Sequence, residues 1–301
     1  MTTETEVKAQ VRQFYDAVGW KQIGEGVYQN ARYEDLRPVS REYIHHCHLR
    51  LGKYLPPAGR FLFDAGSGPI QYPEYLEYSR GFQRRVCLDI SRLALVEART
   101  RIGEHGLFVV GDIANLPFRA EVFDGLVSLH TVHHLPAEEH QPAFIEFYRV
   151  LGPGGKAAVV YSWGSRSPLM RLAAMPIALA FGAQRLYGRL RRGRRSETEF
   201  ERSLAAAGPA GAAGTFTCKH DYRWVTRNLG VLPGLEVRVW RTVSTSFLRA
   251  FIHRRLLGQA WLRWLDWCEE RGPRLLGRLG QYPAILFARP ATHGRSEERV
   301  G

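Results

Sequence analysis

The stretch that decides the fold is FLFDAGSGP at residues 61–69. Three apolar residues lead into Asp64, and a turn with Gly66 and Gly68 follows. Glycine adopts positive φ without steric cost and lets a ligand approach the backbone closely. The free N–H groups of a helix that starts after such a turn attract the anionic part of a ligand. The stretch predicts a strand, a ligand-binding turn and a helix start, although a plain strand–helix turn is the alternative for this loop alone.

Two carboxylates further along the chain favour the ligand-binding interpretation. Asp89 ends the next predicted strand, residues 85–88, and lies 21 residues after Gly68. A carboxylate there can accept both ribose hydroxyls of a nucleoside that lies across the carboxyl edge of a sheet. Asp112 ends the third strand, where it can accept from an adenine amino group while Ile113 packs on the ring. Strand-end aspartates also serve as helix N-caps, but their joint spacing points to one nucleoside.

The first half of the chain alternates between short apolar runs and helical patterns. Helices are predicted at residues 5–18, 40–55, 72–79, 92–104 and 143–151, and strands at 60–63, 85–88, 107–110, 123–129 and 156–161. This alternation is typical of right-handed βαβ units, so the fold class is α/β with a parallel sheet covered on both faces.

The pattern changes after Ser162. An apolar helix is predicted at 167–192 and ends in RLRRGRR, followed by a helix at 197–206, a Gly/Ala/Pro linker at 208–214 and a helix at 221–229. Strands are predicted at 235–240 and 282–288. Between them, residues 247–271 are predicted as one long helix rich in Trp and Arg, and the tail after Pro290 is predicted to be disordered.

Charge divides the chain into two unlike halves. Residues 1–150 carry 17 Lys and Arg against 19 Asp and Glu, a net charge of −2, whereas residues 151–301 carry 25 against 10, a net charge of +15. This asymmetry indicates an anionic membrane surface, nucleic acid or an acidic substrate as a partner of the C-terminal half.

Neither the cysteines nor the termini suggest a secreted or metal-binding protein. The four cysteines are scattered without a CxxC pair, and the first residues lack a basic region followed by an apolar run. The sequence contains no run of 18 uncharged apolar residues, so we expect no membrane-spanning helix. His45 and His48 share a helical face, but no second cluster has partner spacing, so no metal is expected. We therefore expect a cytoplasmic protein, peripheral at a membrane if the basic half binds lipid.

Several motifs together resemble the class I S-adenosylmethionine (SAM)-dependent methyltransferases, and within them the ubiquinone/menaquinone methyltransferase branch. The matching stretches are DAGSG at 64–68, CLDIS at 87–91, GDIANLPF at 111–118, FDGLVS at 123–128, HTVHHL at 130–135 and RVLGPGG at 149–155. The resemblance covers about residues 58–162. It departs from the family at Ile70, where a third glycine is usual.

This resemblance implies a Rossmann-like sheet of seven strands, mostly parallel, with the last strand antiparallel and inserted beside the fifth or sixth. It implies SAM as the cofactor, bound by Asp64, Ala65, Gly66, Ser67, Gly68, Asp89, Ile90, Gly111, Asp112, Ile113 and His130. In this assignment Asp64 reaches the ammonium directly or through water, Asp89 holds the ribose and Asp112 the adenine. His130 lies near the methionine portion and the transferred methyl.

The expected organisation has five parts. A helical lid occupies 1–57, the SAM-binding core 58–162, a helical insertion on the substrate side 163–233, and C-terminal strands with a long helix 234–290, before a disordered tail at 291–301. The lid helix, with Phe14, Tyr15 and Trp20, either covers the cofactor or acceptor site or packs against the sheet edge.

The sulfonium of SAM is already electrophilic, so the protein mainly aligns the acceptor in line with the S–CH₃ bond. A base is needed only where the acceptor carries a proton at the reacting atom. Candidates for a base or a positioning group are His130, His133 and Tyr15, with His134, Tyr28 and Tyr161 as further options. Each histidine has the alternative of a packing or strand-capping role.

The acceptor depends on the C-terminal half. An apolar helix followed by arginines, and a second helix with Trp261, Trp264 and Trp267 among arginines, are typical of elements that lie on an anionic bilayer. A buried helix with solvated arginines is the alternative. We expect a hydrophobic or lipid-like acceptor. An RNA-modifying methyltransferase, a soluble methyltransferase of secondary metabolites and a SAM-binding protein without catalysis stay open as alternatives.

Overall fold

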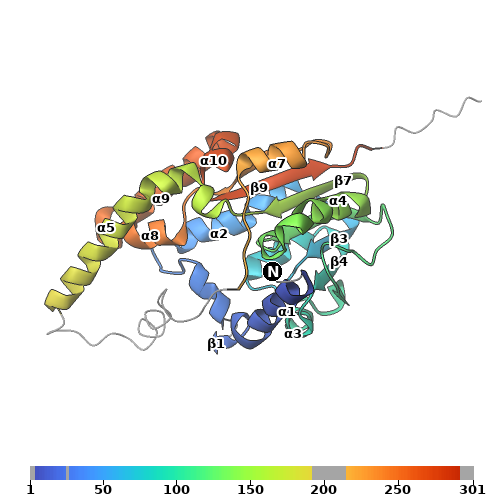
Figure 1. Ribbon diagram of the computed structural model, residues 1–301, viewed down its shortest axis with the longest axis horizontal. Coiled ribbons are helices and arrows are strands. Elements are labelled where there is room, and N and C mark those ends of the chain that lie inside the picture. Colours follow the sequence, from blue (N-terminus) through green and yellow to red (C-terminus); the bar gives the residue numbers. More distant parts are fainter. Residues whose placement is uncertain (1–3, 25–26, 192–214, 292–301) are drawn as a thin grey trace, which may run out of the picture.

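The computed structural model describes residues 4–24, 27–191 and 215–291, and its centre is a seven-stranded sheet (Figure 1). In spatial order the strands are β5 (Gly106–Val110), β4 (Phe82–Asp89), β3 (Gly59–Ala65), β6 (Phe123–Leu129), β7 (Leu151–Val160), β9 (Tyr282–Ala288) and β8 (Glu236–Arg241). β9 is antiparallel to both of its neighbours, whereas the pairs from β5 to β7 are parallel. The predicted fold class is confirmed, including the insertion of the last strand between the fifth and sixth.

Alternation along the strands divides the core into two layers, one on each face of the sheet. Phe63 of β3 and Val159 of β7 belong to one layer, and their chain neighbours Leu62 and Val160 belong to the other. Successive side chains of a strand point to opposite faces, so strands that are apolar at every position are buried on both sides. The covering helices include α3 (Arg92–Ile102), α4 (His140–Val150), α7 (Tyr222–Asn228) and α10 (Pro273–Leu279).

The N-terminal segment consists of more and shorter elements than the sequence predicts. α1 covers Glu4–Phe14, and a wider π-helical turn continues it over Tyr15–Gly19. A short hairpin of β1 (Gln22–Gly24) and β2 (Val27–Tyr28) follows. α2 (Arg41–Leu49) ends in a 3₁₀ turn at Arg50–Tyr54, and a 3₁₀ helix rather than an α-helix covers Pro73–Ser79.

The single long helix predicted at 247–271 is wrong. The structure has α8 (Thr245–Phe251), a 3₁₀ turn at Arg254–Leu256 and then α9 (Gly258–Arg271). The break occurs because Ile252 is extended and Leu257 adopts a left-handed conformation with φ of 56°. Helical periodicity on either side hides this break, since neither glycine nor proline stands at the residue that leaves the helix.

α5 (Pro168–Arg191) confirms the apolar helix after the fifth strand and packs against α8. In Figure 1 it lies with α8, α9 and α10 at one end of the molecule. None of the described helices is long and apolar enough to span a bilayer. The predicted helix at 197–206, the linker at 208–214, the arginines at 192–195 and the tail at 292–301 lie outside the described residues.

Candidate functional site

The glycine-rich turn after β3 brings its backbone unusually close to neighbouring side chains. Gly66 has φ of 75° and Gly68 has φ of 55°. A Cβ at Gly66 would lie 2.2 Å from Cγ2 of Thr131, and one at Gly68 would lie 2.9 Å from the ring of Trp20. Both positions therefore require glycine, for the positive φ and for the close approach. The turn confirms the strand–turn arrangement that the sequence predicts.

Asp89, at the end of β4, is joined to this turn by hydrogen bonds. The N–H of Gly68 donates to Oδ2 of Asp89 at 2.9 Å, and the N–H of Ser91 donates to Oδ1 at 2.8 Å. Burial nevertheless raises the pKa of the Asp89 carboxyl to about 6. A carboxylate oxygen has more than one lone pair, so each oxygen keeps the capacity to accept from a ligand hydroxyl.

A cavity of about 450 Å³ opens beside the turn and Asp89. This volume is typical of small-molecule sites, which measure roughly 300–1,000 Å³. Gly66, Ser67, Gly68, Asp89 and Ile90 form its wall on the sheet side. The site fits the nucleoside and methionine portions of SAM, because two Cβ-free positions and a strand-end carboxylate meet at the edge of one cavity.

The N-terminal segment forms a second wall of the cavity, and its role as a lid stays a prediction. Val11, Phe14, Tyr15 and Trp20 line the cavity, and the rings of Tyr15 and Trp20 stack at 4.9 Å. The Tyr15 hydroxyl lies 2.8 Å from Nε2 of His134. Nδ1 of the same histidine lies 2.9 Å from the carbonyl oxygen of residue 216 and must donate to it. Nε2 is then the acceptor, and Tyr15 donates its proton to it.

His130 and His133 reach the cavity from the end of β6. His130 adopts φ of 57°, and its ring lies edge-on to Trp240 at 4.8 Å. Burial and the nearby charge of Arg241 lower the pKa of His130 to about 3, and burial also lowers the pKa of His133. Both imidazoles are neutral near pH 7. His130 Nε2 and His133 Nδ1 have no hydrogen-bond partner in the described part of the chain, so both can bind a ligand.

The predicted cofactor role of Asp64 finds no direct support in the geometry. Asp64 is absent from the cavity wall, and its buried carboxylate pairs with the buried Arg85 on β4 at 2.5 Å. Ala65 is likewise buried behind the turn. A carboxylate in the middle of the sheet needs a cation next to it, and Arg85 supplies one. Oδ1 of Asp64 keeps no partner among the described residues, so contact through water stays a prediction.

The adenine-side residues also lie outside the cavity wall as the structure has it. Gly111, Asp112 and Ile113 follow β5, but none of them lines the cavity. Lys8 of α1 lies 2.5 Å from Oδ2 of Asp112 and 2.5 Å from Oε1 of Glu139. The N-terminal helix is thus fastened across the end of β5. The contact of Asp112 with adenine remains a prediction. It requires the Lys8 ammonium either to share the Asp112 carboxylate with the adenine amino group or to release that carboxylate.

Two further candidate bases are placed away from the cavity. Tyr28 is buried and donates to Glu97 at 3.3 Å, and Tyr161 lies 3.3 Å from Nδ1 of His140. Neither lines the cavity. His45 and His48, which share a helical face as predicted, both contact Glu74, at 2.7 and 3.8 Å. Among the described residues no group of His, Cys, Asp and Glu is arranged to hold a metal.

Sequence reasoning missed the far wall of the cavity, which comes from five separate segments of the chain. Its members include Glu34, Tyr72, Lys219, Arg241, Gln281 and Tyr282. Arg241 ends β8 and Tyr282 begins the antiparallel β9, so both stand at the same edge of the sheet as Asp89. The predicted strands at 235–240 and 282–288 could have placed Arg241 and Tyr282 at this edge of the sheet. Lys219 lies in a loop, and no sequence pattern indicated that it lines the cavity.

Comparison with known proteins identifies a methyltransferase domain in the part of the chain that carries the glycine turn and Asp89. Residues 63–159 match the family described as methyltransferase domain. The chain is 30% identical over 145 residues to a tRNA (carboxymethyluridine(34)-5-O)-methyltransferase of Xenopus tropicalis, covering 46% of this chain and 21% of the relative. It is 32% identical over 125 residues to the ubiquinone/menaquinone biosynthesis C-methyltransferase of Cereibacter sphaeroides, covering 39% and 48%. The chain thus spans less than half the length of these relatives.

Among solved structures, a phosphoethanolamine N-methyltransferase of Haemonchus contortus in complex with phosphoethanolamine and S-adenosylhomocysteine has a similar fold. Its TM-score is 0.58 at 11% identity, with 96% of this chain and 50% of that chain covered. The identity is low, so this likeness concerns the fold. Taken with the glycine turn and the Asp89 contacts, the match shows that residues 63–159 form a methyltransferase domain, in a chain with the fold of the class I SAM-dependent methyltransferases.

Proposed function

We propose that this chain transfers a methyl group from SAM to a hydrophobic or lipid-like acceptor at an anionic membrane surface. The observation that carries the catalytic part is the cavity itself. It extends from the glycine turn and Asp89 to an aromatic and histidine-bearing wall, so a cofactor held at the turn faces groups that can hold an acceptor. Alignment of two bound reactants is the main contribution that methyl transfer from a sulfonium needs.

In this proposal different residues of the cavity wall bind the cofactor, cover the site and accept a proton. Gly66 and Gly68 let the cofactor approach the backbone, and Asp89 accepts from its ribose hydroxyls. Bound SAM supplies an electrophilic methyl group. Phe14, Tyr15 and Trp20 cover the site and exclude water. Where the acceptor loses a proton, the Tyr15 oxygen can take it while the hydroxyl proton of Tyr15 passes to Nε2 of the neutral His134.

The hydrophobic acceptor is supported by an uncovered apolar face on α5. Leu172 and Met175 are 79% and 71% exposed, and Leu179 and Leu186 are exposed as well. Their spacing of three, four and seven residues puts all four on one side of the helix. A run of large apolar side chains on one exposed helical face is typical of a surface that docks on a partner or a membrane.

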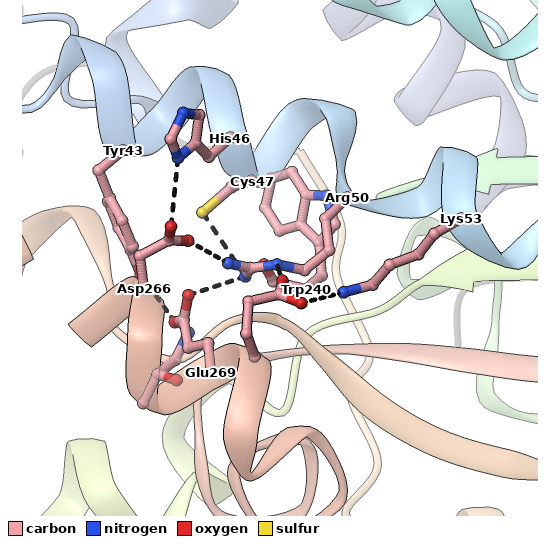
Figure 2. A network of polar contacts seen from close by, with 10 residues as sticks. Tyr43, His46, Cys47, Arg50, Lys53, Trp240, Asp266 and Glu269 are labelled. Atoms are coloured by element: carbon pink, nitrogen blue, oxygen red, sulfur yellow. Dashed lines mark hydrogen bonds and ion pairs between the residues drawn. The ribbon is translucent and has the colours of Figure 1, made fainter. Parts of the chain in front are cut away.

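One side of α9 carries acidic side chains that point toward the C-terminal end of α2 (Figure 2). Asp266 and Glu269 face α2, where they pair with Arg50 at 2.6 and 2.8 Å, and Glu270 pairs with Lys53 at 2.5 Å. The acidic side of the helix is therefore neutralised within the protein.

The opposite side of α9 carries Trp261, Trp264 and Trp267, which are 60%, 56% and 54% exposed. Tryptophan is favoured at the boundary between headgroups and acyl chains because its ring is apolar and its N–H is polar. Outward tryptophans over an inward acidic face are expected for a helix that lies on a bilayer and unexpected for one that faces only water.

Arginines surround this apolar end of the molecule. Arg171, Arg185, Arg254, Arg255 and Arg263 form no ion pair with any described residue. Each basic residue close to an anionic leaflet contributes about 1 kcal/mol of attraction. The charge sign and the exposed tryptophans together favour an anionic bilayer as the occupant of this face.

Co-sedimentation with vesicles tests the membrane part. Vesicles of phosphatidylcholine with phosphatidylglycerol should bind the protein at low salt, and pure phosphatidylcholine vesicles should bind it more weakly. The double variant Trp261→Ser/Trp264→Ser should bind at least about tenfold more weakly. Leu93→Ser/Val96→Ser is the matched control, since these residues of α3 are also exposed. Equal binding by both variants would contradict the proposal, as would self-association of the protein that accounts for the face without lipid.

Label transfer tests the acceptor. Methyl-labelled SAM is incubated with the protein and, separately, with a lipid extract, bulk RNA and a metabolite extract. We expect label in the lipid fraction. Label in RNA would replace this proposal with an RNA-modifying activity, which the names of the tRNA-methylating relatives and the basic C-terminal half would then explain. Label only in small metabolites would remove the membrane from the function.

A further inference from the structure

Lys219 occupies a fixed place beside the cavity. The N–H of Cys218 donates to the carbonyl oxygen of His133 at 2.8 Å, and the N–H of His220 donates to the Tyr161 hydroxyl at 3.0 Å. The backbone is thereby held on both sides of Lys219. Because these bonds fix the course of the chain, the lysine side chain leaves from one defined position in the cavity wall.

The side chain of Lys219 packs over Gly164 on its way. A Cβ at Gly164 would lie 2.7 Å from Cδ of the lysine, and Gly164 also has φ of 58°. A glycine at this position leaves the space that the lysine stem occupies. The stem is therefore confined between the loop and Gly164, which limits the directions that its ammonium can take.

The four charged side chains of the cavity wall differ in how they are satisfied. Asp89 accepts two backbone N–H groups, and Glu34 forms an ion pair with Arg241. The Arg241 guanidinium also lies over the ring of Tyr282, 4.5 Å from its centroid. Lys219 has neither a hydrogen bond nor an ion pair with any described residue. It is the cation of the described wall that a ligand can neutralise.

Burial makes this position costly for a lone cation. Lys219 is only partly exposed to water, and burial lowers the pKa of its ammonium. The free-energy cost of removing an ammonium from water is offset only when an anion or several hydrogen-bond acceptors lie next to it. The wall near it offers neutral imidazoles, because burial and the lysine charge lower the pKa values of His130, His133 and His134.

Uncommitted polar atoms surround the same space. In the described part of the chain no partner is found for Nε2 of His130, Nδ1 of His133 or Oγ1 of Thr215, and all three residues line the cavity. Buried polar atoms in folded proteins are nearly always hydrogen-bonded. Imidazole N–H and hydroxyl donors next to an ammonium form a site for an oxyanion.

We propose that Lys219, with the imidazoles of His130 and His133, binds an anionic oxygen group of the methyl acceptor, a carboxylate or a phosphate. The inference rests on the proposed methyltransferase function and narrows its acceptor to an amphiphile with an acidic head. The apolar part of such a molecule lies against the aromatic wall, and the acidic head fixes which atom faces the cofactor.

The test uses the full chain saturated with S-adenosylhomocysteine. Octyl phosphate, octanoate and octyl glucoside are titrated calorimetrically, with inorganic phosphate as a fourth probe. We expect at least one acidic amphiphile to bind more tightly than octyl glucoside. Lys219→Met should weaken that binding about 10- to 100-fold, the range for a hydrogen bond to a charged group. Lys219→Arg should retain most of it, and Lys156→Met, which removes an exposed lysine of β7, should have no effect.

The four probes separate the possible sources of the anion. A preference for octyl phosphate assigns a phosphate head and a preference for octanoate a carboxylate, and either supports the inference. Equal binding of all three amphiphiles would overturn it, and so would an acidic preference that survives in Lys219→Met. A tenfold loss of S-adenosylhomocysteine affinity in Lys219→Met would also overturn it, because the lysine would then hold the cofactor's own carboxylate.

Failure of the underlying function has a separate signature. If the wild-type protein does not bind S-adenosylhomocysteine, the methyltransferase proposal itself fails. If it binds the cofactor product and shows no dependence on Lys219, only the anion site fails. Thermal denaturation of Lys219→Met, expected within a few degrees of wild type, establishes that the variant is folded.

Discussion

The Tyr15 hydroxyl donates to Nε2 of His134 at 2.8 Å, and this contact fastens the N-terminal segment to the loop after β6. The two residues are far apart in the sequence. Their rings also meet edge to face at 5.4 Å. The N-terminal wall of the cavity and His134, which also lines the cavity, are therefore in direct contact.

Tyr15→Phe removes this contact and keeps the stacking on Trp20. Nε2 of His134 is then left without its donor, so we expect a loss of about 1–3 kcal/mol in the free energy of unfolding. Urea denaturation measures it. Tyr222→Phe serves as the control, since the described residues form no hydrogen bond with that hydroxyl. Equal stability of the two variants would show that the Tyr15 contact does not hold the lid.

Asp89 makes cofactor affinity depend on pH. Burial raises the pKa of its carboxyl to about 6, so the ligand-free protein holds a proton there below pH 6. Ribose hydroxyls bind best to the carboxylate, and binding must then release the proton. Calorimetry should show constant S-adenosylhomocysteine affinity above about pH 7 and up to a tenfold loss per pH unit well below pH 6.

Asp89→Asn provides the control for that titration. The amide has no proton to release in this range, so its affinity should be weaker at pH 7.5 and nearly independent of pH between 5 and 7.5. A variant that keeps the wild-type pH profile would assign the titration to another group and would remove Asp89 from the ribose site.

The Asp64–Arg85 pair is expected to hold the fold rather than the cofactor. Arg85→Met leaves the buried Asp64 carboxylate without its cation and should cost about 3–5 kcal/mol of stability. Asp64→Leu/Arg85→Met removes both charges and should recover much of that loss. S-adenosylhomocysteine affinity of the double variant should stay within about threefold of wild type. A tenfold loss would restore the direct cofactor role that the family resemblance implies for Asp64.

Gly66→Ala should damage the turn more than an ordinary glycine substitution. The new Cβ would meet Thr131 at 2.2 Å, and φ of 75° is strained for alanine. We expect a loss of more than about 1 kcal/mol together with loss of cofactor binding. Gly52→Ala is the matched control, because no atom lies within 4 Å of its added Cβ. Intact cofactor binding in Gly66→Ala would contradict the close-approach argument.

The sequence alone determined the sheet and the cofactor edge of the site. The mostly apolar runs at 60–63, 85–88 and 123–129 predict strands that are covered on both faces of a sheet. This prediction depends on the local sequence pattern and not on which residues pack against the strands. The glycine turn and Asp89 lie at strand ends, so topology brings them together without further information. Gly66, Gly68 and Asp89 accordingly line one cavity, and their contact with the cofactor stays a prediction.

Only the tertiary structure decided what the other polar residues do. Whether Asp64 faces a ligand or Arg85, and whether Asp112 is open or held by Lys8, depends on contacts between residues distant in the sequence. The break at Leu257 is a left-handed backbone conformation, with φ of 56°, that local periodicity does not record. Lys219 reaches the cavity because the loop after the insertion is fastened to His133 and Tyr161. Contacts of this kind are set by the folded chain as a whole, whereas strand and turn patterns are set locally.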